Sequence, residues 1–368
     1  MDYRPVCAHV LEVALKVKKD EKIWIDGWDH TVDLVSLLAQ EARKRGCEVH
    51  TTVKDEGAWT QALRTGPESR LRRLSTEQLA LLNEVDSYVF TLGPKNRIDW
   101  ARIPPRRRKL ATTWLLEQND FVRQWTSISK RRRVKMVGIE ATLATEERAK
   151  ALGLDYANWR RMMFDACLLD YRELSGRAGR LRRFLKGDSW VRITTPRGTD
   201  LRLQLAGRTP EFSDGLATQQ VARDGGVVYL PPGFVGTTVE ETSAEGKVVY
   251  DSPIRFPEGR VEKLALQLKS GRIEGCTADS GVEAIRSVLR TTPGDVDRFS
   301  YFGIGLNPKI RLGYTQDDRV LGSVELNFGA NRHRGGKNRG DRNWWGTVER
   351  ATIIVGGRRV MENGKLLV

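Results

Sequence analysis

The sequence predicts an α/β protein of two domains, an N-terminal α/β domain with a mostly parallel sheet at residues 1–185 and a C-terminal β-rich α+β domain at residues 186–368. Three observations support this fold class. In the first half, short apolar runs alternate with longer segments of helical periodicity, as in right-handed βαβ units that build a covered parallel sheet. After Gly187, short alternating segments separated by glycine turns dominate. The 368 residues are also enough for two domains of ordinary size.

The elements of the N-terminal half follow from their apolar spacing. Residues 31–45 place Val35, Leu38 and Ala42 on one helical face, and Gly46 is expected to end that helix. The other predicted helices are 71–82, 109–125, 146–151 and 156–185. The predicted strands are 22–26, 48–53, 87–90 and 133–139.

The elements of the C-terminal half are mostly strands. Residues 189–195 and 201–205 alternate on either side of a Pro-Arg-Gly-Thr-Asp turn, which predicts a hairpin. Residues 282–289 are predicted to form a helix. The further predicted strands are 227–229, 247–250, 260–268, 322–328 and 351–355.

Charge is the unusual feature of the composition. Hydrophobic residues make up 39% and charged residues 30% of the chain, which excludes disorder as its main character. The net charge is +15, which favours anionic partners or reflects an Arg-rich proteome. The basic clusters at 106–109, 130–133 and 180–183 are short and are expected to be solvated faces. They carry no interleaved aromatic residues of a known module, so nucleic-acid binding ranks last.

Cysteine usage and the N-terminus predict a cytoplasmic protein. The four cysteines are far apart and form no CxxC pair, as expected of reduced, buried thiols. The first residues lack the charged-then-apolar pattern of a signal peptide. No apolar run reaches the roughly 18 residues of a membrane span, so no membrane partner is expected.

Known catalytic motifs are missing from the sequence. It contains no Rossmann fingerprint, P-loop or GxSxG elbow, and Gly303-Ile304-Gly305 is a lone GxG of the kind found in tight turns. Only four histidines occur, without HExxH spacing. The residues alone therefore indicate no active site.

Five short motifs in the second half resemble, in the same order, segments of the aminopeptidase T family of metallopeptidases. The Gly-Thr-Asp-Leu hairpin at 198–201 and the order of the N-terminal elements fit as well. The dihydroxypyridine dioxygenases, iron enzymes of the same fold, are similar in length. The resemblance implies the aminopeptidase T type of fold and a homodimer. The motifs lie at 230–235, 303–308, 321–329, 335–345 and 354–364.

This sequence departs from the metal ligands that the resemblance implies, which are two Glu, two His and one Asp. Zinc needs three or four protein ligands, and a non-haem iron dioxygenase needs two His and one carboxylate. The sequence therefore predicts a metal-free, non-catalytic member, a pseudoenzyme without cofactor. The corresponding positions are Phe234, Tyr301, Glu325, Asn343 and Trp345, or Trp344 and Gly346 for the last two if the alignment shifts by one residue.

The replacements predict an aromatic cleft with a basic rim. Aromatic side chains offer large contact area at low entropic cost, although core filling is an equal alternative for Phe234. Adjacent strand residues point to opposite faces, so a core accommodates only one of the two tryptophans easily. The loop 331–342 adds basic residues that would clamp carboxylates, unless it is merely solvated. The predicted peptide-binding residues are Phe234, Tyr301, Glu325, Arg332, Arg334, Arg339, Arg342, Trp344 and Trp345.

Two functions compete on this basis. The first is binding of an acidic precursor peptide for modifying enzymes, because the degenerate pattern resembles the aminopeptidase-like proteins of ribosomal-peptide pathways such as the crocagin pathway. The second is an active metalloenzyme with unusual ligands, either an aminopeptidase or an Fe(II) ring-cleaving dioxygenase. That site would have to be assembled from Glu325, His333, Asp341 and Glu240 or Glu241, and Glu325 or His333 would serve as a general base.

Overall fold

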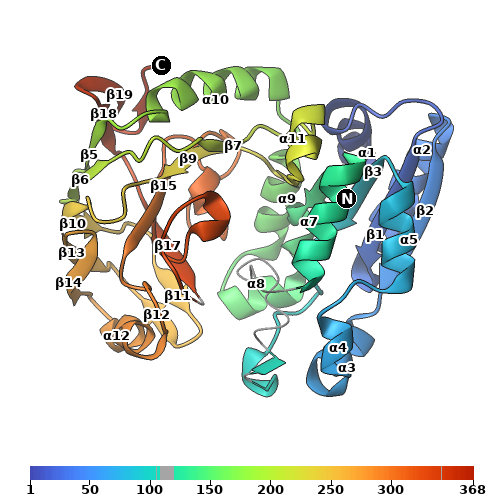
Figure 1. The fold of residues 1–368 in the computed structure, drawn as a ribbon, viewed down its shortest axis with the longest axis horizontal. Helices are drawn as coiled ribbons and strands as arrows, with labels where there is room; N and C mark the ends of the chain where they lie inside the picture. The colour runs from blue at the N-terminus through green and yellow to red at the C-terminus, as the bar shows by residue number, and fades with distance from the viewer. Residues whose placement is uncertain (105, 108–119, 341) are drawn as a thin grey trace. The chain divides into compact units, whose positions relative to one another are not determined.

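The computed structural model describes residues 1–104, 106–107, 120–340 and 342–368. The chain forms two compact units (Figure 1). Unit 1 comprises residues 1–171 and 215–232, and unit 2 comprises residues 172–214 and 233–368. Most of helix α10 (Tyr171–Leu185) therefore groups with the second unit. No helix among the described residues is long and apolar enough to cross a membrane.

Unit 1 is built on a five-stranded parallel sheet in the order β2-β1-β3-β4-β8. Its strands are β1 (Lys22–Trp28), β2 (Glu48–Lys54), β3 (Ser87–Thr91), β4 (Lys135–Ile139) and β8 (Val228–Leu230). Its helices include α1 (Arg4–His9), α2 (Val32–Lys44), α3 (Glu56–Thr65), α4 (Glu68–Leu71), α5 (Thr76–Glu84), α7 (Asp120–Arg132), α8 (Glu146–Leu152), α9 (Tyr156–Asp165) and α11 (Gln219–Asp224).

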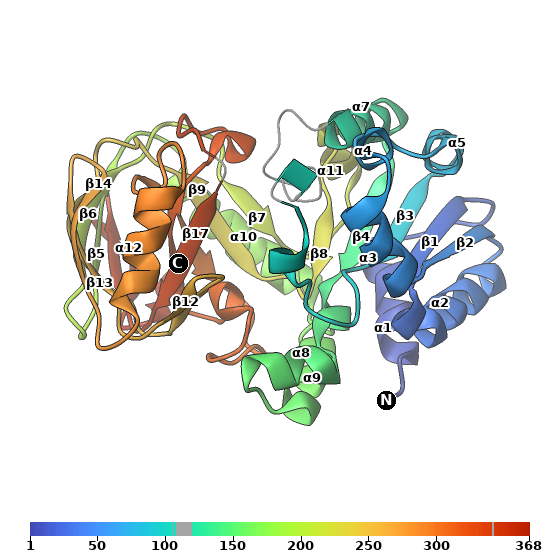
Figure 2. The same cartoon turned by 90° about the horizontal axis from the view of Figure 1, so that it is seen from below.

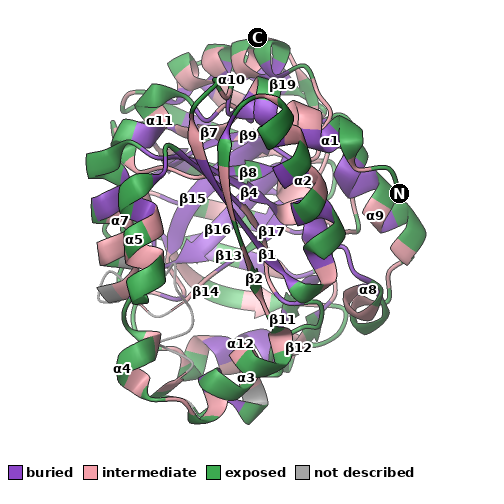
Figure 3. Cartoon of the chain, turned by 90° about the vertical axis from the view of Figure 1, so that its right-hand side faces the viewer, coloured by how far each residue is buried: buried purple, intermediate pink, exposed green. Residues whose placement is uncertain are grey.

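Helices cover both faces of this sheet (Figure 3). On one face, Trp24 and Tyr88 pack with residues of α5 and α7 in a buried aromatic and aliphatic cluster. The other face is covered by α2, whose Val35 approaches so closely that a Cβ at Gly27 would lie 2.4 Å from it. The predicted end of α2 is confirmed, because Gly46 takes a φ of +79° just after the helix.

Unit 2 contains two antiparallel sheets and a two-stranded ribbon. The larger sheet has the order β14-β13-β10-β6-β5-β18-β19-β20. Its strands are β5 (Trp190–Thr194), β6 (Asp200–Gln204), β10 (Glu245–Val249), β13 (Ala265–Lys269), β14 (Arg272–Thr277), β18 (Thr352–Val355), β19 (Arg358–Glu362) and β20 (Lys365–Leu366). Helix α12 (Val282–Thr291) packs on β12 (Gly259–Val261), which pairs with β11 (Ile254–Phe256) (Figure 2).

The smaller sheet of unit 2 has the order β17-β16-β15-β9-β7. One of its faces is core. Trp344 on β17 is 3% exposed, stacks on Phe328 with ring centroids 4.8 Å apart, and donates its indole N–H to the carbonyl of Val296 at 2.9 Å. Tyr250 closes this face and donates its hydroxyl to the carbonyl of Leu326 at 3.0 Å. The strands are β7 (Glu211–Ser213), β9 (Phe234–Thr238), β15 (Phe299–Gly305), β16 (Val324–Gly329) and β17 (Asn343–Val348).

The predicted fold class is confirmed: a parallel sheet forms the α/β part and antiparallel sheets form the β-rich part. The helix predicted over 156–185 is two helices, α9 and α10, separated by residues 166–170. Of the helix predicted over 109–125, residues 109–119 lie outside the described part of the chain, and α7 begins at Asp120.

Candidate active site

The second face of the smaller sheet carries two carboxylates in one row. Glu211 pairs with Gly236, Gly236 with Gly303, and Gly303 with Glu325. Directly paired residues point to the same side of a sheet. Glu211 and Glu325 therefore stand on one face, separated by two residues that have no side chain.

Tyr301 occupies the space above these two glycines. A Cβ at Gly236 would lie 2.2 Å from the Tyr301 hydroxyl oxygen, and a Cβ at Gly303 would lie 3.1 Å from the tyrosine ring. The same Cβ at Gly303 would lie 3.3 Å from a carboxylate oxygen of Glu325. The glycines thus let the phenol lie flat on the sheet, between the strands that carry the two glutamates.

Arg334 supplies a positive charge above this row. It ends the single turn η6 (Arg332–Arg334), and its guanidinium lies 4.2 Å from the Tyr301 ring centroid and 3.0 Å from a carboxylate oxygen of Glu211. Burial alone would lower the pKa of Arg334, but Glu211, Tyr301 and Glu325 raise it above its ordinary value. The guanidinium is therefore a permanent cation beside both carboxylates.

Glu325 is the buried carboxyl of this row whose pKa lies near neutral pH. It is 6% exposed, and burial followed by the nearby Asp318 raises its pKa to about 7, against the opposing effect of Arg334. Burial also raises the pKa of Tyr301 well above its usual value, so the phenol keeps its proton. A carboxyl that titrates near neutral pH beside a phenol and a guanidinium has the composition of a general acid–base site.

The residues on this face do not fit a catalytic metal. In the part of the chain that the structure describes, no three ligand atoms of His, Cys, Asp or Glu gather closely enough here to share an ion, and the cation beside the carboxylates is the Arg334 guanidinium. Among the described residues, the trio of His, Cys, Asp or Glu ligand atoms close enough to share an ion is Glu48, His50 and Glu84 in unit 1. There, the Lys22 ammonium lies 2.5 Å from Glu84 and 3.8 Å from Glu48, so one cation already shares the two carboxylates.

The structure brings together some of the predicted site residues and separates others. Phe234 is half-buried and Trp345 is 39% exposed, and both share the face of Glu325 by register. Trp344 lies on the core face and is not part of the proposed site. Arg342 makes a bidentate ion pair with Glu258 at 2.9 and 3.1 Å. The side chains of Arg332, His333 and Arg339 are exposed, and Asp341 lies outside the described residues.

Glu211 was missed by the sequence analysis. It lies on a three-residue strand without clear alternation, and its partner Arg334 is 123 positions further along the chain. No local sequence signal marks such a residue, because its place in the site depends on strand pairing.

The loop 331–342 is tied down at its base by a buried carboxylate. Glu241 is 2% exposed and accepts a bidentate pair from Arg208 at 2.7 and 2.9 Å. It also accepts the Asn331 amide at 3.1 Å and the backbone N–H of Lys337 at 2.7 Å. Burial would raise the pKa of Glu241, but these donors outweigh it and hold the pKa below its ordinary value. Glu241 is thus an anchor of the loop and is fully occupied by these partners.

Replacement of Glu241 by Gln is expected to destabilise the protein by about 3 kcal/mol, because it leaves the Arg208 guanidinium partly buried without its counter-charge. Urea unfolding at neutral pH measures the loss. The exposed Glu274 on β14, replaced in the same way, serves as the matched control and is expected to change stability by less than about 0.5 kcal/mol. Equal stability of the two variants would contradict the anchoring role.

Two solved structures share this fold over nearly the whole chain. The wild-type AmpT from Thermus thermophilus has a TM-score of 0.67 and 17% identity, and the match covers 99% of both chains. The 2,5-dihydroxypyridine dioxygenase from Pseudomonas putida KT2440 has a TM-score of 0.65 and 17% identity, covering 99% of this chain and 96% of that chain. No curated protein sequence matches the chain.

A family model extends the comparison to sequence. The model described as thermophilic metalloprotease (M29) matches residues 6–297, which ends just before strand β15 and therefore before Tyr301 and Glu325. Both this family and the AmpT structure point to an enzyme. The expectation of a non-enzyme, drawn from the missing metal ligands, is contradicted by these matches. The chain belongs to the thermophilic metalloprotease (M29) family.

Proposed function

We propose that this protein is an enzyme that hydrolyses amide bonds of peptides, with Glu325, Tyr301 and Arg334 as the catalytic residues. The family supports the reaction class. The observation that carries the site assignment is the buried Glu325 carboxyl on one sheet face with the Tyr301 phenol, over whose ring the Arg334 guanidinium lies at 4.2 Å from the centroid. No step is assigned to a metal, because the donor set around Glu325 does not fit one.

The chemistry follows from these three groups. The Glu325 carboxylate takes a proton from a water molecule as the water oxygen attacks the peptide carbonyl carbon. Negative charge then develops on the carbonyl oxygen, and the Arg334 guanidinium and Tyr301 hydroxyl stabilise it. The protonated Glu325 finally gives its proton to the leaving amine as the C–N bond breaks. A pKa near the working pH suits both proton transfers.

Peptide recognition is proposed to use the exposed rim of the same face. Trp345 offers a large indole surface next to the row that carries Glu325, and Phe234 offers a half-buried ring. The exposed side chains of Arg332 and Arg339 would favour a peptide with carboxylates. A homodimer, expected from the resemblance, stays a prediction.

The test is turnover of a panel of aminoacyl p-nitroanilides and of short acidic peptides, measured after chelator treatment and again with added Zn²⁺, Mn²⁺ or Fe²⁺. We expect amide hydrolysis that persists in chelator. Absence of turnover under every condition would contradict the proposal, as would hydrolysis that depends strictly on added metal. Oxygen-dependent cleavage of 2,5-dihydroxypyridine would assign the chain to a different reaction.

A further inference from the structure

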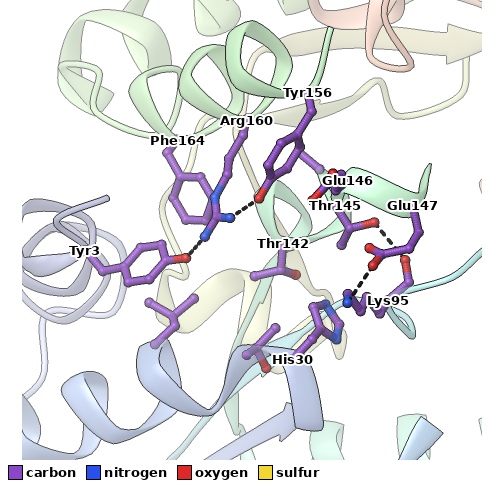
Figure 4. A pocket seen from close by; sticks show the side chains of 13 residues that line it. Tyr3, His30, Lys95, Thr142, Thr145, Glu146, Glu147, Tyr156, Arg160 and Phe164 are labelled. Atoms are coloured by element: carbon purple, nitrogen blue, oxygen red, sulfur yellow. Dashed lines mark hydrogen bonds and ion pairs between the residues drawn. The ribbon is translucent and has the colours of Figure 1, made fainter. Parts of the chain in front are cut away.

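A cavity of about 240 Å³ is lined by residues of unit 1 (Figure 4), whereas the residues proposed for catalysis belong to unit 2. It opens at the carboxyl ends of three parallel strands. His30 follows β1, Lys95 follows β3 and Thr142 follows β4. In the sheet order, β1 lies between β2 and β3, so the chain leaves β1 to one side and returns on the other. Ligands of open α/β sheets bind at such a switch point.

One wall of the cavity presents a cation without a carboxylate partner. Figure 4 shows the Arg160 guanidinium between the hydroxyls of Tyr3 and Tyr156, and it donates to both. The ring centroids of Tyr3 and Tyr156 also lie 5.7 and 5.6 Å from the guanidinium carbon. Within the described residues, Arg160 forms no ion pair, and its buried Nε has no hydrogen-bond partner. The two tyrosine hydroxyls therefore hold the Arg160 guanidinium in place, and no carboxylate neutralises its positive charge within the described residues.

The other wall presents an unfilled acceptor. One carboxylate oxygen of Glu147 lies 2.5 Å from the Lys95 ammonium, and in the described part of the chain the other is buried without a hydrogen-bond partner. The ring nitrogens of His30 are also buried without such a partner there, with Asp29 3.6 Å from Nδ1. Burial lowers the pKa of His30, against the opposing effects of the Thr142 backbone and Asp29, which favours the neutral ring with one acceptor nitrogen.

The remaining lining is suited to a small apolar group. Leu34 and Phe164 contribute hydrocarbon surface, and the tyrosine rings extend it. The volume falls slightly below the range of about 300–1,000 Å³ typical of sites for drug-sized ligands. The ligand must therefore be small. A multiply charged anion such as a phosphate ester would be repelled by the carboxylates of Glu146 and Glu147. The arrangement of charges therefore favours a ligand that carries opposite charges at its two ends.

We propose that this cavity binds a free α-amino acid with an apolar side chain, its carboxylate at Arg160 and its ammonium group at Glu147 and His30. The site is distinct from the proposed catalytic residues and does not depend on them. Its occupant is of the chemical class that a peptidase releases, so product sensing would be a consequence of binding.

Isothermal titration of the unmodified protein with three related ligands tests the proposal. L-Leucine carries both charges, 3-methylbutylamine lacks the carboxylate, and N-acetyl-L-leucine lacks the ammonium group. We expect L-leucine to bind and each analogue to bind at least about tenfold more weakly, since each loses one charged hydrogen bond. Absence of L-leucine binding, or equal binding of the amine, would overturn the proposal. Tighter binding of inorganic phosphate than of L-leucine would overturn it as well.

Two variants locate the binding. Arg160→Gln and Glu147→Gln are each expected to weaken L-leucine binding at least about tenfold. Arg161→Gln, an exposed neighbour on the same helix, is the matched control and should bind normally. Unchanged affinity in Arg160→Gln would contradict the site. Glu325→Gln should keep its L-leucine affinity, which separates this cavity from product bound at the catalytic residues. If the Arg160 variant fails to fold, the ligand series still decides the question.

Discussion

Replacement of Glu325 by Gln is expected to lower kcat/KM for amide hydrolysis by about 10²–10⁴-fold, the usual contribution of a general base. The same change is expected to increase stability at alkaline pH. The pKa of Glu325 is raised in the folded protein to about 7 from an ordinary value of 4.5. The folded state therefore binds this proton more tightly than the unfolded state does.

The stability that Glu325 contributes decreases as the pH rises. The stabilisation from protonated Glu325 is complete below about pH 4.5 and is lost as the pH rises through about 7. Above that pH, ionisation of the buried carboxyl lowers the free energy of unfolding by about 3 kcal/mol. Gln stays neutral and has nearly the same shape, so the variant should lack this loss. A residue with a merely structural role would lose stability when replaced.

The measurement combines steady-state kinetics with urea unfolding at about pH 5 and about pH 8. Glu274→Gln, an exposed carboxyl on β14, is the matched control and is expected to leave both properties unchanged. Full activity in Glu325→Gln would remove the residue from the catalytic set. Reduced stability of Glu325→Gln at alkaline pH would contradict the proposed burial of its charge.

Replacement of Arg334 by Gln is expected to destabilise the protein by about 3–5 kcal/mol at alkaline pH, because two glutamates on one sheet face lose their shared cation. Since Arg334 opposes the rise in the Glu325 pKa, its removal should also raise that pKa further. The activity that remains should therefore begin to rise only at higher pH than in the unmodified protein.

A double replacement separates charge from packing. Adding Glu211→Gln to Arg334→Gln removes the uncompensated partner and is expected to restore part of the lost stability. Arg290→Gln, on the exposed side of α12, is the control and should change stability by less than about 0.5 kcal/mol. Additive losses in the double variant would show that Glu211 and Arg334 do not interact.

Local patterns predicted much of the fold. The apolar stripe of α2 and the glycine after it are confirmed, because both depend on neighbours within a few residues. The predicted start of α5 at 71 is too early, because Ser75 and Gln78 form a capping box and the helix begins at 76. The opposite orientation of Trp344 and Trp345 follows from strand geometry and is observed.

The site was less predictable, for a physical reason. Glu211, Gly236, Gly303 and Glu325 come from four strands, and only their pairing registers place them in one row. A single sequence does not contain that information. The loss of the metal ligands stays a prediction, whereas the conclusion that no enzyme remained was wrong. A buried carboxyl beside a cation offers acid–base chemistry that ligand counting does not detect.

The most direct test of the proposed site is the pH profile of kcat/KM for chelator-treated protein on one aminoacyl p-nitroanilide. If Glu325 is the general base, kcat/KM should rise with pH through about 7, and this step should be absent in Glu325→Gln. A profile without a step near neutral pH would contradict the account, as would the same step in Glu325→Gln.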